Sequence, residues 1–168
     1  MFLTNSRKMK MKNNDFQCWI DYEFKSYYLD SSKQGLRIIF SKGISNFYRT
    51  NIRKYISFLR KRYFFPMRCY VYITYKKQYQ SDGRTFSGHF TYPTGEQDFW
   101  PSIHLACKAP DSNEELKNKL FALTGLLTFY YQWYFFLHKE RTHRSLMIEA
   151  GRMASYLVTL YIDENGIN

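Results

Sequence analysis

The stretch ALTGLLTFYYQWYFF, residues 122–136, decides how the rest of this chain must be arranged. It belongs to a run, residues 120–137, that contains no charged side chain. A helix that is apolar on all sides belongs in a protein core or in a bilayer, and this run has about the minimum length that spans one. Thr124, Thr128 and Gln132 place polar groups along it, and no other segment suits a membrane. The sequence therefore predicts a buried central helix and no membrane partner.

Two helices are predicted in the last third of the chain. Ser112 is followed three residues later by Glu115, which is a capping-box pattern. The central helix should therefore begin near Ser112, and we expect it to run to about His138. A last helix is expected to begin at Thr142 or Ser145 and to end near Asp163.

The part of the chain before these two helices is predicted to form short strands around one helix. Apolar residues at helical spacing predict a helix over residues 44–63, closed by Pro66. An Asp-Gly pair at residues 82–83 indicates a hairpin turn. Strands are expected at residues 35–43, 67–79, 85–92 and 102–108, and residues 16–29 suggest a further strand or an irregular start.

Strands first and two helices at the end predict an α+β domain. Its sheet should be small and mixed or antiparallel, with one basic helix after the first strand and two C-terminal helices. A chain of 168 residues is long enough for one domain with a proper core. We expect residues 1–14 to form a basic flexible tail and residues 15–168 to form a single domain.

The positive charge is concentrated in the first half of the chain. The formal net charge is +11. Residues 1–80 hold 17 Lys and Arg against 4 Asp and Glu, a net of +13, and residues 81–168 hold 8 against 10, a net of −2. Such polarity suggests a basic face that attracts nucleic acid or an acidic protein surface. A solvated face without a partner gives the same composition.

The helix over residues 44–63 is the strongest candidate for a binding surface. Its basic side chains are interleaved with Tyr48, Tyr55 and Tyr63, and such a mixture can follow a phosphate backbone while rings stack on bases. The alternative is an ordinary amphipathic helix that binds nothing and whose charged side chains face water. The candidate patch comprises the basic residues of this helix and of the following hairpin: Arg49, Arg53, Lys54, Arg60, Lys61, Arg62, Lys76, Lys77 and Arg84.

Cysteine and histidine give no sign of a disulfide framework or a metal site. Cys18, Cys69 and Cys107 are odd in number and far apart. His89 and His104 lie on expected strands and could approach each other, but nothing in the sequence fixes that. The N-terminus lacks the apolar core of a signal peptide, so a cytoplasmic protein is expected.

The C-terminal helices carry a more specific pattern. LTFYYQWYFF, residues 127–136, precedes RTHRSLMIEAGRMASYLV, residues 141–158. With YFFPMRCYVYI, residues 63–73, and GRTFSGHFTYP, residues 83–93, they resemble a family of small zincin-like metallopeptidase proteins common in Firmicutes and their mobile elements. The family's first helix carries His-Glu-Leu-Thr-His-Tyr-Tyr-Gln-Trp. The resemblance covers most of residues 15–165 and implies a zincin-like fold.

The residues that would bind zinc in that family are replaced here. Gly125 and Phe129 stand where the two histidines are expected, and Leu126 stands where the catalytic glutamate is expected. Glu149 remains, at the position of a third ligand. Two histidines four apart bind zinc as a pair, and the glutamate takes a proton from the metal-bound water. The resemblance therefore implies a catalytically inactive protein with no metal and no cofactor.

The replacements are apolar or small, so we expect the former metal pocket to close as hydrophobic core. Glycine inside a helix costs about 1 kcal/mol relative to alanine. We therefore expect a neighbouring ring or backbone to pack over Gly125. Glu149 is expected to be structural and to pair with Arg144 or Arg152 on its own helix.

Three hypotheses about function follow from these observations. The first is a catalytically inactive zincin-like protein that binds a protein or nucleoprotein partner. For it, the resemblance suggests a phage or mobile-element inhibitor of a host defence complex, of the anti-CRISPR type. The second is a protein that binds DNA or RNA through the basic helix over residues 44–63. The third, an active hydrolase, is disfavoured by the missing ligands.

Overall fold

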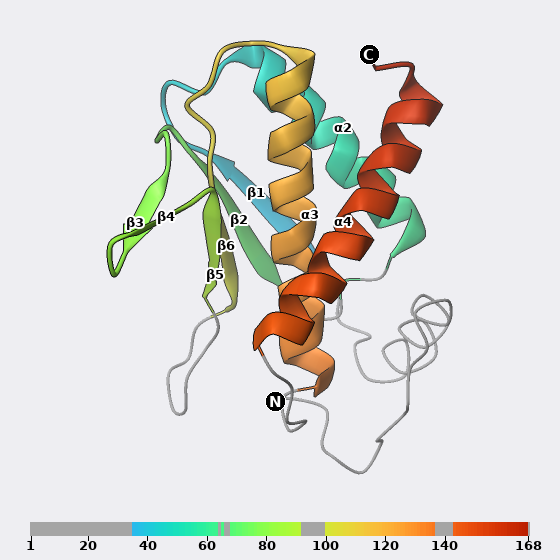
Figure 1. The fold of residues 1–168 in the computed structure, drawn as a ribbon. Helices are drawn as coiled ribbons and strands as arrows, with labels where there is room; N and C mark the ends of the chain where they lie inside the picture. Colours follow the sequence, from blue (N-terminus) through green and yellow to red (C-terminus); the bar gives the residue numbers. More distant parts are fainter. Residues whose placement is uncertain (1–34, 64, 66–67, 92–99, 137–142, 168) are drawn as a thin grey trace.

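The structure, a computed structural model, describes residues 35–63, 65, 68–91, 100–136 and 143–167. It confirms the predicted α+β class, with helices and a mixed sheet (Figure 1). The expected tail and the segment over residues 16–29 lie outside the described residues. In chain order the elements are β1 (Leu36–Phe40), α2 (Asn46–Arg62), β2 (Cys69–Thr74), β3 (Tyr79–Ser81), β4 (Arg84–Phe86), β5 (Gly88–Thr91), β6 (Ser102–Ala106), α3 (Asn113–Phe136) and α4 (His143–Asn165).

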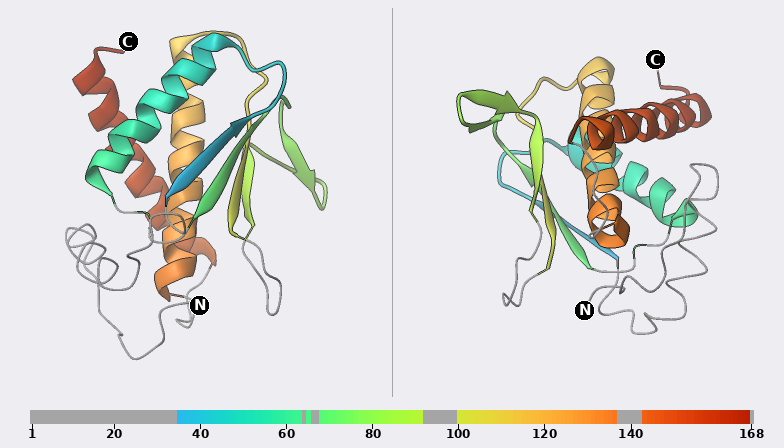
Figure 2. Two further views of the ribbon diagram at one scale, coloured as in Figure 1. Left: turned by 180° about the vertical axis from the view of Figure 1, so that it is seen from behind. Right: turned by 60° about the horizontal axis from the view of Figure 1, so that its bottom comes forward.

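One layer of the molecule is a four-stranded sheet with the order β1-β2-β6-β5. β1, β2 and β6 are parallel, and β5 is antiparallel to β6. The parallel connection from β1 to β2 passes through α2, as such a pair requires. α2, α3 and α4 lie on the same side of this sheet, and the β3-β4 hairpin projects away from them (Figure 1, Figure 2).

Alternation along the strands separates the two faces of the sheet. In β2 the side chains of Cys69, Val71 and Ile73 are buried beneath the helices, whereas Tyr70 and Tyr72 are half-buried on the opposite face. Because successive side chains in a strand point to opposite faces, one face of the sheet belongs to the core. We call the other one the outer face; its central residues are Tyr70, Tyr72, His89 and His104.

α2 covers the core face with one side. The Ser45 hydroxyl caps its first turn by accepting a hydrogen bond from the Tyr48 backbone N–H at 3.4 Å. Ile52, Ile56 and Leu59 are buried at helical spacing. The last turn consists of Arg60, Lys61 and Arg62, where positive charge favours the negative end of the helix dipole.

α3 is the predicted central helix. The Ser112 hydroxyl accepts from the Glu115 backbone N–H at 3.2 Å, which confirms the predicted cap. Most side chains over residues 120–134 are buried, including the polar Thr124, Thr128 and Gln132. Within the described part of the chain, no helix combines the length and the apolar character that crossing a bilayer requires.

The hairpin region differs from the expected strands. The expected strand over residues 67–79 ends at Thr74, whose carbonyl oxygen accepts from the backbone N–H groups of Lys76 and Cys107. The expected return strand over residues 85–92 is two strands, and they belong to different sheets. The chain changes direction at Ser87, whose carbonyl oxygen accepts from the Ala106 N–H of the main sheet. The turn itself is as predicted, because Asp82 and Gly83 both have positive φ angles, 50° and 73°.

A buried hydrogen bond joins α2 to α3. Tyr55 is fully buried, and its hydroxyl lies 2.5 Å from the Thr124 hydroxyl. Thr124 donates its one hydroxyl hydrogen to the Leu120 carbonyl oxygen at 2.7 Å, so Tyr55 is the donor to Thr124. Burial raises the pKa of Tyr55 above its ordinary value, which keeps the phenol protonated.

Candidate functional site

The positions that the sequence resemblance assigns to a metal site, Gly125, Leu126, Phe129 and Glu149, do not form a catalytic arrangement. Leu126 is 7% exposed and packs within the core, and Phe129 packs partly buried against it. Leu126 reaches the edge strand β5 at Gly88, where an added Cβ would lie 2.7 Å from the Leu126 Cδ1. Glu149 is half-buried on α4. A hydrocarbon side chain, that of Leu126, therefore occupies the position to which the resemblance assigns the general base.

Gly125 does not have the neighbour that the sequence led us to expect. A Cβ built at this position meets no atom of the described residues within 4 Å outside its own helix turn. The expectation that a ring or backbone packs over Gly125 is therefore wrong. The residues near it on the less buried stripe of α3 are Phe121, which is exposed, and Ala122 and Phe129, which are half-buried. No close approach among the described residues requires glycine at position 125.

Metal chemistry finds no support in the described part of the chain. There, no group of three His, Cys, Asp or Glu side chains is placed to hold a metal ion. Cys69 and Cys107 are both free and buried. Burial raises the pKa of the Cys107 thiol to about 11, and that of Cys69 is raised as well. Both thiols are therefore protonated at neutral pH and poorly suited to act as nucleophiles.

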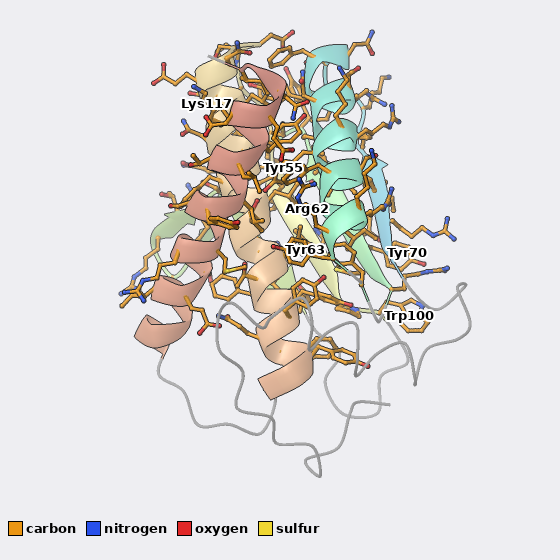
Figure 3. All side chains as sticks on the ribbon, turned by 90° about the vertical axis from the view of Figure 1, so that its right-hand side faces the viewer. Tyr55, Arg62, Tyr63, Tyr70, Trp100 and Lys117 are labelled. Atoms are coloured by element: carbon orange, nitrogen blue, oxygen red, sulfur yellow. The ribbon has the colours of Figure 1, made fainter. Side chains whose placement is uncertain are left out.

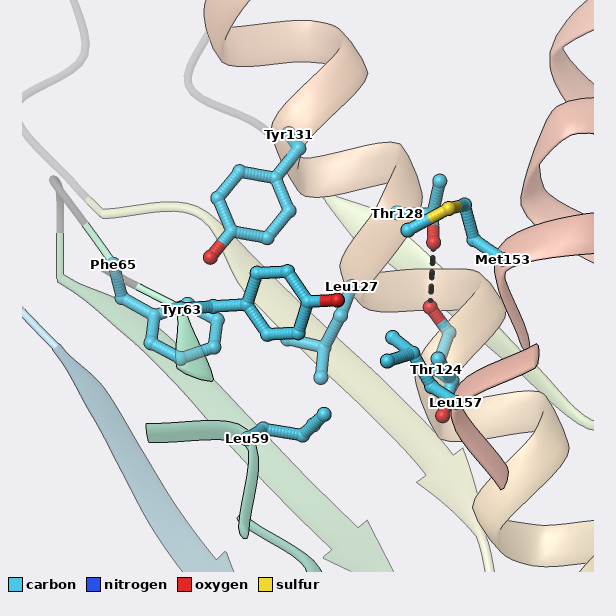
Figure 4. Close-up of a pocket in the computed structure, with 9 residues that line it drawn as sticks. All are labelled: Leu59, Tyr63, Phe65, Thr124, Leu127, Thr128, Tyr131, Met153 and Leu157. Carbon is cyan, nitrogen blue, oxygen red and sulfur yellow. Dashed lines mark hydrogen bonds between the residues drawn. The ribbon is translucent and has the colours of Figure 1, made fainter. Parts of the chain in front are cut away.

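A small apolar pocket lies elsewhere, where the end of α2 meets α3 and α4 (Figure 4). Gly125, Leu126 and Phe129 do not line it. The Thr128 hydroxyl, which faces it, is satisfied by the Thr124 carbonyl oxygen at 2.9 Å. The lining residues are Leu59, Tyr63, Phe65, Thr124, Leu127, Thr128, Tyr131, Met153 and Leu157. We interpret it as a gap in the helix packing.

The basic side chains of α2 divide into anchored and available groups. Arg49 donates to the carbonyl oxygens of Ile44 at 2.9 Å and Ser41 at 3.3 Å. Arg60 donates to the Leu36 carbonyl oxygen at 2.6 Å, and burial lowers the pKa of Arg60. Arg60 thus fastens the end of α2 to β1, and Arg49 fastens its beginning to the loop that follows β1.

The remaining cations of α2 are Arg53, Lys54, Lys61 and Arg62. The first three are exposed. Among the described residues, no carboxylate lies within salt-bridge distance of Arg53, Lys54 or Lys61, whereas Arg62 pairs with Glu164 of α4 at 2.8 Å. The positive charge that no described carboxylate neutralises is thus concentrated on the outward side of α2, and the Arg53 guanidinium lies over the Phe40 ring of β1, 4.9 Å from its centroid.

The tyrosines of α2 do not share this surface. Tyr48 is 1% exposed and Tyr55 is fully buried, so the expectation that these rings stack on bases is wrong. Tyr48 donates to the Pro110 carbonyl oxygen at 2.5 Å, and burial raises its pKa to about 12. Figure 3 shows Tyr55 in the space between α2 and α4. The helix offers charge to a ligand rather than ring faces.

The hairpin cations, which the candidate patch also includes, belong to other elements than α2. Lys76, Lys77 and Arg84 are exposed near β3 and β4, which project from the sheet on the side away from α2 (Figure 1). Lys76 lies over the Tyr79 ring, 5.2 Å from its centroid. The structure therefore contains two separate basic regions, and the hairpin region includes the exposed Asp82.

An aromatic row crosses the outer face, and the sequence did not predict it. Tyr72, His104 and His89 are paired in register on β2, β6 and β5. The Tyr72 and His104 ring centroids are 4.9 Å apart, and those of His104 and His89 are 4.5 Å apart. Both pairs are stacked, and the Tyr79 ring meets His89 edge-on. The alternation of Tyr70 and Tyr72 with buried Val71 and Ile73 was the available signal.

This row stacks on itself, which limits what it offers to a ligand. The rings of Tyr72, His104 and His89 are nearly parallel, so neighbouring rings cover each other's faces. Ring edges, rather than ring faces, are then what the row offers to a ligand. Burial, followed by Lys76, lowers the pKa of His89; burial, then His89 and Lys76, lowers that of His104. Both histidines are thus neutral at pH 7, and the row does not add positive charge to the sheet.

No family model, curated protein or solved structure matches this chain. The zincin-like relationship therefore remains a prediction of the sequence. The surface of α2 is the candidate site that the geometry itself supports.

Proposed function

We propose that this protein acts by binding rather than by catalysis, and that its ligand is the phosphate backbone of a nucleic acid, alone or within a nucleoprotein complex. One observation carries the proposal. Residues 35–91 contain 12 Lys and Arg and one acidic residue, Asp82. Of these cations, Arg53, Lys54 and Lys61 are presented together on the outward side of α2.

We expect contacts to phosphates rather than to bases, because the aromatic side chains that could stack on bases are engaged elsewhere. Tyr48 and Tyr55 are in the core, and the rings of the outer face stack on one another. Contacts from Lys and Arg to phosphate carry little sequence information. We therefore expect binding to be indifferent to sequence and strongly dependent on salt.

The test is fluorescence anisotropy of labelled oligonucleotides, titrated with the protein at two salt concentrations. Duplex and single-stranded DNA and RNA of unrelated sequences should all bind at low salt. The affinity should fall steeply when salt rises, because bound phosphates release condensed counterions. Absence of binding at low salt to every probe would refute the proposal.

A protein partner is the second candidate function. The sequence resemblance suggests it, and the observation that favours it is the position of β5 at the edge of the sheet. An extended peptide could add to such an edge through main-chain hydrogen bonds. The discriminating result is a stoichiometric protein partner that is retained after Arg53, Lys54 and Lys61 are neutralised.

A further inference from the structure

The outward side of α2 is not flat. A shallow groove runs between α2 and the end of α4, and Figure 3 shows Arg62 in this space. Its lining includes four cations, Arg53, Lys54, Lys61 and Arg62, and one carboxylate, Glu164; the remaining lining residues are Ser57, Phe58, Tyr161 and Asn165. The charged lining therefore sums to 4 − 1 = +3. Because a groove brings several cations around one ligand, it is a better phosphate site than a convex helix surface.

The guanidinium group of Arg62 is held in place in this groove. It lies over the Phe58 ring, 4.1 Å from the centroid, and donates to the Glu164 Oε1 at 2.8 Å. Phe58 is buried and packs edge-on against Tyr161 of α4, with 5.2 Å between centroids. The buried Phe58 ring thus supports the Arg62 guanidinium from one side. The guanidinium N–H groups have one described carboxylate as a partner, that of Glu164.

The negative charge of Glu164 does not stabilise α4. It is in the last turn of α4, which contains no basic residue, and the negative end of the helix dipole disfavours a carboxylate there. The side chains of Arg62 and Glu164 are 36% and 43% exposed, and a pair at this exposure contributes little to stability. The structural effect of the Glu164 charge is to occupy Arg62.

We propose that the groove between α2 and α4 binds a phosphate group of the nucleic-acid backbone, and that Glu164 attenuates this binding by competing for Arg62. This inference rests on the proposed function, which it deepens by naming the contact. The incoming phosphate replaces the Glu164 carboxylate as the acceptor of the Arg62 guanidinium. Arg53, Lys54 and Lys61 supply the surrounding positive charge.

The proposal makes the unusual prediction that removing a charged contact strengthens binding. Glu164→Gln should raise the affinity for a labelled DNA duplex about three- to tenfold at low salt. It should also steepen the dependence of log K on log salt by about one, since one further phosphate is contacted. Circular dichroism and thermal unfolding should show an unchanged fold, because the exposed pair stabilises little.

Asp163→Asn is the matched control. Asp163 is exposed, is the neighbour of Glu164 and does not line the groove, and its substitution changes the net charge equally. The proposal requires a clearly smaller gain from Asp163→Asn than from Glu164→Gln. It also requires the gain to disappear in the double variant Arg62→Gln/Glu164→Gln.

The outcomes separate this inference from the proposed function. If wild-type protein binds nucleic acid but Glu164→Gln and Asp163→Asn have equal effects, the groove assignment fails and the proposed function stands. If wild-type protein binds no nucleic acid, the proposed function fails, and the groove assignment that rests on it fails with it. Inorganic phosphate alone, titrated by calorimetry, completes the test: tight binding of the free anion would identify a small-molecule site and overturn the assignment to a backbone phosphate.

Discussion

The His89 ring of β5 lies nearly parallel to the His104 ring of β6, with 4.5 Å between the ring centroids and 18° between the ring planes. The two residues are register partners in the antiparallel pair. The Thr91 hydroxyl lies 3.4 Å from the His89 Nδ1, and the Ser102 hydroxyl lies 3.1 Å from the His104 Nε2. This contact disfavours protonation of both imidazoles, because two cations stacked at this distance repel each other.

The histidine pair predicts a loss of stability in mild acid. The pKa values of His89 and His104 are lowered in the folded protein, so the unfolded chain takes up protons first as the pH falls. The free energy of unfolding should therefore be highest above the unfolded histidine pKa of about 6.5 and decrease as the pH falls below it. Denaturant unfolding at about pH 7.5 and about pH 5.5 measures the decrease.

His89→Gln/His104→Gln is the control for this pH effect. If the pair is responsible, the double variant should lose less stability than the wild type over the same pH interval. An identical decrease in both proteins would assign the acid sensitivity to other groups.

Gly125→Ala should stabilise the protein. The glycine is inside α3 and an added Cβ meets no neighbour among the described residues, so the substitution removes the backbone-entropy cost of helical glycine without a clash there. We expect the free energy of unfolding to rise by about 0.5–1 kcal/mol. Gly88→Ala is the contrast: its Cβ would strike the His104 carbonyl oxygen and the Leu126 Cδ1, so it should destabilise. Destabilisation by Gly125→Ala would mean that close packing at this position does require glycine.

Tyr55→Phe should weaken the connection between α2 and α3. The substitution removes the hydroxyl that donates to Thr124, while Thr124 keeps its own bond to the Leu120 carbonyl oxygen. The expected cost is about 1 kcal/mol, measured by denaturant unfolding. Tyr156→Phe is the matched control, since Tyr156 is 62% exposed on α4 and should change stability within error. Equal effects would contradict the structural role of the buried hydroxyl.

The replaced motif predicts that the protein does not retain zinc. Gly125 and Phe129 provide no metal ligand, and one carboxylate from Glu149 cannot hold the ion alone. Protein purified without added metal should contain far less than one zinc per chain by plasma mass spectrometry. Stoichiometric zinc, together with peptidase activity that a chelator abolishes, would restore the hydrolase hypothesis.

Local patterns predicted the elements well because the signals that define them are local. Ser112 caps α3 as its spacing with Glu115 indicates, and the Asp82-Gly83 turn has the backbone angles that this pair favours. The division of the expected strand at Ser87 was not predictable in the same way. It depends on a hydrogen bond to Ala106 in β6, which is remote in sequence.

The candidate surface was predicted in part. The basic residues of α2 stood out in the sequence, but their interleaved tyrosines suggested a mixed charged and aromatic surface. Tyr48 and Tyr55 share helical spacing with Ile52, Ile56 and Leu59, and that periodicity was the signal for their burial. The carboxylate that faces Arg62 comes from Glu164, 102 residues later in the chain. Only the packing of α4 against α2 reveals it.

The most direct test of the account compares salt dependence between two variants of equal charge. Arg53→Gln/Lys54→Gln/Lys61→Gln neutralises the outward side of α2, and Lys77→Gln/Arg84→Gln/Lys108→Gln neutralises three exposed cations outside α2. Fluorescence anisotropy with one labelled DNA duplex gives the slope of log K against log salt for each. We predict that the α2 variant binds at least about tenfold more weakly, with a slope shallower by about two to three, while the other variant stays close to the wild type. Equal changes in both variants would show that net charge, rather than the surface of α2, governs binding, and would contradict the account.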